Sequence, residues 1–107
     1  MSLQVIKTAL NSTGLPFAHH AWAKDATVLK HDHGVWAEDD ENDLCAGTIH
    51  VEKVIQGAIH YFTRDDTEAP RTTIETALNT GEIAWYLNTI QYEEDTGFIH
   101  YEWIFEV

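Results

Sequence analysis

The N-terminal segment carries apolar residues at helical spacing. Leu3, Ile6 and Leu10 recur every three or four residues, which places them on one face of a helix that Ser2 can cap. Residues 11–14, Asn-Ser-Thr-Gly, are poor helix formers and finish with a glycine that tolerates positive φ. The pattern therefore predicts a short amphipathic helix that these four residues terminate.

A second helix is predicted around Ile74, Ala77 and Leu78, which form a similar apolar stripe. Pro70 suits the first turn of a helix, where a backbone N–H has no partner within the helix, and Gly81 marks the end. Because both helices are short, together they can cover only part of one face of a sheet.

The other apolar residues follow strand spacing, in which every second side chain lies on the same face. Thr48 to Thr63 is the longest such run, and Lys53 and Gly57 interrupt its alternation, which predicts a bend or bulge. The last two strands are joined by residues 93–97, a hairpin turn that ends in glycine. The predicted strands comprise residues 17–22, 35–37, 48–63, 83–92 and 98–107.

These elements give the order αβββαββ in a single domain over residues 1–107. Because the strands follow one another through short turns, we expect an α+β fold with a mainly antiparallel sheet of four or five strands and both helices on one face. Apolar residues on the less covered face either fill the core through strand twist or form an interface between subunits. The residues predicted for this interface are Phe62, Tyr86, Ile90 and Tyr92, with Val54 on the same face.

The charge of the chain narrows the choice of partners. Its 107 residues include 18 acidic and 6 basic side chains, for a net charge of −12. The basic residues are scattered, so we expect protein partners, with no direct DNA binding and no membrane contact. There is no secretory signal and no apolar run of about 20 residues, and Cys45 is the only cysteine. We therefore expect a soluble protein made in a reducing compartment.

Motifs for catalysis are largely missing from the sequence. It contains neither a Gly-x-x-x-x-Gly-Lys phosphate loop nor a Gly-x-Gly-x-x-Gly fingerprint. Ser2 and Ser12, the only serines, do not lie in a nucleophile elbow. Cys45 could pair with His50, but the acidic residues before Cys45 disfavour its thiolate form. We therefore expect no enzymatic activity and no cofactor.

Seven histidines raise the question of a metal site. His31 and His33 lie on one side of an extended segment, and the neighbouring pair His19-His20 can lie across from them. None of the spacings matches a Cys-x-x-Cys, His-x-x-x-His or His-Glu-x-x-His site. We therefore predict no metal site, with His31 and His33 as the weak candidates. The histidines that fall on polar positions of predicted strands, and could also converge, are His50, His60 and His100.

An acidic run follows the second predicted strand and is expected to form a hairpin loop. Its spacing resembles the start of a calcium-binding loop, but Leu44 stands where glycine is needed and His50 where the closing glutamate belongs. The run is either a solvated loop or a docking tip for a basic partner surface. The candidate docking residues are Glu38, Asp39, Asp40, Glu41 and Asp43.

Several segments taken together carry a family resemblance. They comprise Ser12-Thr13-Gly14-Leu15-Pro16-Phe17, the run from Ile49-His50-Val51-Glu52 to Tyr61-Phe62-Thr63, Ile74 to Leu78, and Gly97 to Phe105. With these segments, nearly the whole chain resembles the tail terminator, or tail completion, proteins of long-tailed bacteriophages and prophages. Residues 31–34, His-Asp-His-Gly, depart from relatives that often have a Pro- and Tyr-containing segment there.

The resemblance implies a structural subunit of the virion without catalytic residues. Such proteins form a ring, commonly of six copies, that caps the tail tube and docks to the head connector. The implied partners are further copies of the chain, the major tail tube protein and head connector proteins. The implied locations are the virion tail and, during assembly, the host cytoplasm.

Three other interpretations stay open at this point. The chain could have another connector role, such as stopper or adaptor. It could be a small metal-binding or hydrolytic enzyme that uses its histidines. It could also be an α+β dimer that binds a small ligand in a pocket lined by its aromatic residues.

Overall fold

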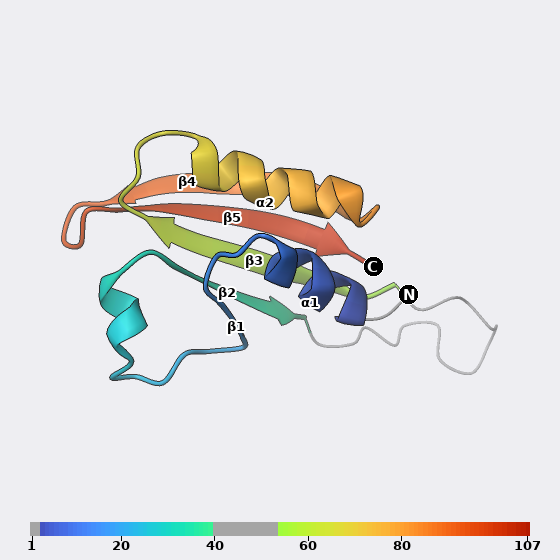
Figure 1. Cartoon of the computed structure of the whole chain (residues 1–107), viewed down its shortest axis with the longest axis horizontal. Coiled ribbons are helices and arrows are strands. Elements are labelled where there is room, and N and C mark those ends of the chain that lie inside the picture. The colour runs from blue at the N-terminus through green and yellow to red at the C-terminus, as the bar shows by residue number, and fades with distance from the viewer. Residues whose placement is uncertain (1–2, 40–53) are drawn as a thin grey trace.

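A computed structural model describes residues 3–39 and 54–107, in which two helices lie on one face of a five-stranded sheet (Figure 1). The chain is therefore an α+β protein, as predicted. No helix in the described residues is long and apolar enough to cross a membrane. The elements are α1 (Leu3–Ser12), β1 (Phe17–His19), the 3₁₀ helix η1 (Thr27–Lys30), β2 (His33–Glu38), β3 (Gln56–Thr63), α2 (Ala69–Thr80), β4 (Ala84–Glu93) and β5 (Phe98–Glu106).

The sheet is mixed, with the strand order β1-β2-β3-β5-β4. Strand β2 is antiparallel to β3, and β5 is antiparallel to both β3 and β4, but β1 runs parallel to β2. The prediction of a mainly antiparallel sheet is therefore met only in part. Its first strand also ends at His19 instead of Trp22, because the chain there leaves the sheet for η1 before it returns as β2. A connection of that length allows a parallel pair, whereas a tight turn does not.

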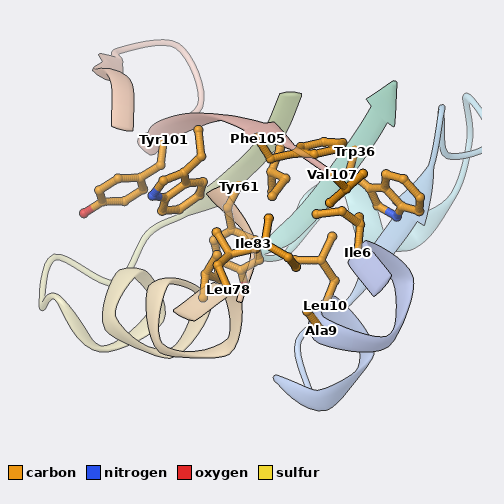
Figure 2. Packing of buried hydrophobic residues seen from close by; sticks show 13 residues of the cluster. Ile6, Ala9, Leu10, Trp36, Tyr61, Leu78, Ile83, Tyr101, Phe105 and Val107 are labelled. Atoms are coloured by element: carbon orange, nitrogen blue, oxygen red, sulfur yellow. The ribbon is translucent and has the colours of Figure 1, made fainter. Parts of the chain in front are cut away.

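The core lies between the helices and one face of the sheet, here called the helix side (Figure 2). Ile6 and Leu10 of α1 and Ile74 and Leu78 of α2 are almost fully buried, in agreement with the predicted stripes. Each buried aliphatic side chain of this size contributes about 1.5–3 kcal/mol to stability. The sheet residues buried on this side are Trp36, Ile59, Tyr61, Tyr101, Trp103 and Phe105.

Trp103 is the largest fully buried side chain, and its position depends on one polar contact. Its indole N–H donates to Oε2 of Glu75 in α2 over 2.9 Å, and Arg71 donates to the same oxygen over 3.1 Å. A buried N–H without a partner would cost free energy, so this contact lets the sheet hold a tryptophan beneath a helix.

A β-bulge divides β4. The register against β5 shifts between Leu87 and Thr89. Residues directly opposite each other in an antiparallel pair share a face. Tyr86, opposite Ile104, therefore lies on the face away from the helices, here called the open face. Strict alternation from the sequence would have placed Ile90 on that face too.

After the bulge the faces are exchanged. Ile90 lies opposite Tyr101, and Tyr92 opposite Ile99, both of which belong to the helix side of β5. The assignment of Tyr86, Ile90 and Tyr92 to one sheet face is therefore wrong. The three side chains are nevertheless exposed by 56%, 49% and 66%, because β4 is an edge strand and the helices do not cover them.

Gly57 permits a close approach inside the sheet. A Cβ atom at this position would collide with the carbonyl oxygen of Ala37 in β2 and with the ring of Phe105 in β5. The alternation break that the sequence showed at Gly57 is thus a packing requirement at the start of β3. The strand predicted from Thr48 begins only at Gln56, since Val54 and Ile55 lie outside it, and residues 48–53 lie outside the described residues.

We predict that Gly57→Ala lowers the free energy of unfolding by about 1–3 kcal/mol, because the new methyl group meets backbone that is fixed by strand pairing. Urea denaturation followed by circular dichroism measures this change. A midpoint equal to that of the unmodified protein would show that β2 and β3 do not approach as closely as described.

Candidate functional site

The open face carries a row of stacked rings across three strands. Phe62 of β3 stacks on His33 of β2 with ring centroids 4.9 Å apart, and on His100 of β5 at 4.2 Å. Phe98 meets both Phe62 and His33 edge to face, and the Arg64 guanidinium lies 3.9 Å above the Phe98 ring. The row lets the sheet bury aromatic surface on the side away from α1 and α2.

His60 and His100 converge beside this row, as their polar positions on the strands allowed. Nδ1 of His60 lies 2.8 Å from Nε2 of His100, so one ring donates a hydrogen bond and the other accepts it. Nε2 of His60 is 3.6 Å from Oε2 of Glu102, whose other oxygen accepts a hydrogen bond from Asn88 over 3.0 Å. This polar network spans β3, β4 and β5.

The environment of His100 disfavours a second proton on the pair. Burial and the neighbouring His60 lower the pKa of His100, against weaker opposing effects of Glu93 and Glu102. The unfolded chain therefore takes up this proton more readily as the pH falls below about 6.5, the ordinary value for imidazole. The contribution of neutral His100 to stability is present above that pH and is lost on acidification.

We predict that the melting temperature falls between about pH 7 and pH 5, and that His100→Gln reduces this fall because it removes the titrating ring. His31→Gln is the matched control, since that side chain is exposed. Thermal unfolding at several pH values measures the effect. Equal pH profiles for the unmodified protein and His100→Gln would contradict the assignment.

The two weak metal candidates, His31 and His33, do not form a pair. His33 is buried, with its ring against Phe62, and its Nδ1 lies 2.8 Å from the backbone oxygen of His31. The His31 side chain is exposed. Local spacing placed both rings on one side of the chain, but strand pairing with β3 places His33 within the aromatic row.

Within residues 3–39 and 54–107, one group of three side chains could hold a metal ion: His19, His20 and Glu38. The ligand atoms all lie within 4.8 Å of one another. Nε2 of His19 is 2.6 Å from Oε1 of Glu38, and Nε2 of His20 is 3.5 Å from the same oxygen. The group lies where the edge strand β1 ends beside β2.

Glu38 was expected in the acidic docking loop, and its role beside the histidines was missed. It is the last residue of β2 and is only partly exposed. Hydrogen bonds from its own backbone N–H and from the His19 ring lower the pKa of Glu38, so the side chain is a carboxylate at neutral pH. The contact depends on the parallel register that pairs His19 with Trp36, and no pattern along the sequence indicates that register.

The remaining acidic run is described only at its start. Asp39 is exposed, and its backbone N–H donates to the carbonyl oxygen of Gln56. The other candidate docking residues, Asp40, Glu41 and Asp43, lie outside the described residues, as do Cys45 and His50.

A groove of about 480 Å³ runs between the two helices. None of its lining residues is aromatic or ionisable, so it does not resemble the aromatic ligand pocket of the third interpretation. The lining residues are Gln4, Val5, Thr8, Ala9, Ser12, Ala77, Thr80 and Gly81.

The sequence was also compared with known proteins. No protein-family model matches it, and no curated protein matches it.

Proposed function

We propose that this chain is a structural subunit of a long-tailed phage, a tail terminator that forms a ring at the head–tail junction. The observation that carries the proposal is the edge strand β4. It has ten residues, lies at one end of the sheet formed by residues 3–39 and 54–107, and carries three exposed large side chains: Tyr86, Ile90 and Tyr92. An exposed edge strand can pair with a strand of another chain, and exposed apolar patches mark interaction surfaces.

A second copy of the same chain is the occupant that we favour. Each end of the sheet is different, because the opposite edge is the three-residue strand β1. A contact between β4 of one subunit and a different surface of the next is heterologous, and heterologous contacts form a ring when the rotation between subunits closes. The resemblance to tail terminator proteins favours closure, commonly with six copies.

The four residues predicted for the interface divide into two groups. Tyr86, Ile90 and Tyr92 are exposed and available to a partner. Phe62 is partly buried and stacks with His33 and His100, so its role is to pack the side chains of the open face. We therefore assign the contact to β4 and give Phe62 a supporting role.

The charge of the chain fits the passage of DNA through a ring. With a net charge of −12, a lumen lined by these subunits would repel phosphates instead of holding them. In this proposal the acidic residues that follow β2 in the sequence, Asp39, Asp40, Glu41 and Asp43, dock to a basic surface of the tail tube or the head connector, whereas Glu38 ends β2 and contacts His19. The protein would act in the virion tail, after assembly in the host cytoplasm, without enzymatic activity.

We predict that Tyr92→Glu abolishes self-association while the monomer remains folded. Tyr92 is 66% exposed, so the substitution removes little from the core, and a carboxylate in an apolar contact opposes association. We expect the unmodified protein to be a monomer at low concentration and low salt, and to form larger species as either rises, because salt screens the repulsion between subunits. Light scattering measures the mass.

The matched control is Thr76→Glu, which adds the same charge on an exposed position of α2. This variant should associate like the unmodified protein, and circular dichroism should show all three proteins folded. If the unmodified protein stays a monomer under every condition and is absent from purified tails in phage complementation, the ring proposal is wrong. Unchanged association of Tyr92→Glu would instead move the contact away from β4.

We also predict that the protein does not retard duplex DNA in a gel at about 0.1 M salt. The reason is its charge of −12 and the scatter of its six basic residues along the sequence. Retardation that weakens as salt rises would contradict the proposed non-binding lumen.

A further inference from the structure

We propose that His19, His20 and Glu38 form a binding site for a divalent transition-metal ion, with Zn²⁺ as the typical occupant. Two imidazoles and one carboxylate are a common ligand set for Zn²⁺, in which the remaining position is left to water or another ligand. This inference does not rest on the ring proposal, because the site lies at the ends of β1 and β2, with His20 just after β1, and not on β4.

The positions of the ligand atoms suit one ion. Tetrahedral Zn²⁺ with bonds of about 2.1 Å holds its ligand atoms about 3.4 Å apart. Oε1 of Glu38 lies 2.6 Å from Nε2 of His19 and 3.5 Å from Nε2 of His20. Without metal, a proton between His19 and the carboxylate accounts for the shorter distance, and an ion would take the place of that proton. Small side-chain rotations would therefore complete the site.

The His19 ring stacks on two neighbouring rings. Its centroid lies 3.9 Å from the ring of Trp36, with an interplanar angle of 10°, and 4.0 Å from that of His20. Trp36 itself is buried in the core, so the stack is anchored to the fold. A ligand whose ring is already oriented loses less conformational freedom when it binds a metal ion.

The backbone of His20 is what places two adjacent imidazoles side by side. Neighbours along a strand normally point to opposite faces. His20 instead has φ of 73°, in the left-handed region that non-glycine residues rarely adopt, and its N–H donates to the carbonyl oxygen of Trp36 over 2.8 Å. This conformation turns the His20 ring back over His19, so that both Nε2 atoms approach Glu38.

The experiment is a calorimetric titration of the untagged, metal-free full chain with Zn²⁺. We expect one ion per chain and a rise in melting temperature on binding, since the ion binds the folded state. Two variants test the ligands. His20→Asn removes one imidazole and keeps a residue that tolerates positive φ, and Glu38→Gln removes the charge with little change of shape. Each should weaken binding by at least about tenfold.

Two further variants serve as matched controls. His31→Asn removes an exposed imidazole elsewhere, and His100→Asn removes a member of the open-face pair; both should bind Zn²⁺ as the unmodified protein does. Circular dichroism without metal checks that each variant is folded. The proposal is overturned if the unmodified protein binds no Zn²⁺, or if His20→Asn and Glu38→Gln bind it equally well. Loss of binding in His100→Asn alone would place the ion at the open face and also overturn it.

Discussion

The burial of one sheet face under two short helices is the constraint on which the rest of the molecule depends. Each helix supplies a narrow apolar stripe, and both stripes pack against the same side of the sheet. The hydrogen bond from Trp103 to Glu75 joins β5 to α2 and gives a partner to an indole N–H that would otherwise be buried without one. On the open face, the described side chains pack against one another, with Phe62 stacked on both His33 and His100.

Local patterns were enough to predict the parts of the fold that depend on local physics. The stripe of Leu3, Ile6 and Leu10 predicted α1, and the stripe with Ile74 and Leu78 predicted α2. The residues that a helix buries recur every three or four positions, so the pattern is visible within a short segment. The turn before Phe98 likewise located the last hairpin. Two features were missed for one reason: the parallel direction of β1 and the bulge in β4 are decided by pairing between strands, and alternation along one strand does not contain that information.

The same limit explains what the sequence could predict of the candidate site. His60 and His100 occupy polar positions of two strands, and their contact followed once those strands became neighbours. The positions of residues along the strands were not enough to predict the group of His19, His20 and Glu38. It depends on a left-handed backbone at His20 and on the pairing of β1 beside β2, neither of which changes the spacing of the residues along the chain. Metal motifs are recognised by the spacing of residues along the sequence, so they do not detect a site whose ligands come from different strands.

The bulge in β4 has a consequence for how this protein can aggregate. A long, regular edge strand invites strand addition, in which copies extend one another's sheets into fibrils without end. The register shift between Leu87 and Thr89 interrupts the ladder in the middle of the edge and turns the apolar side chains on either side of it to different faces. A partner that binds this edge must therefore contact side chains on both faces of the sheet. Such a contact has a defined geometry, which favours finite assemblies over open-ended β-sheet growth.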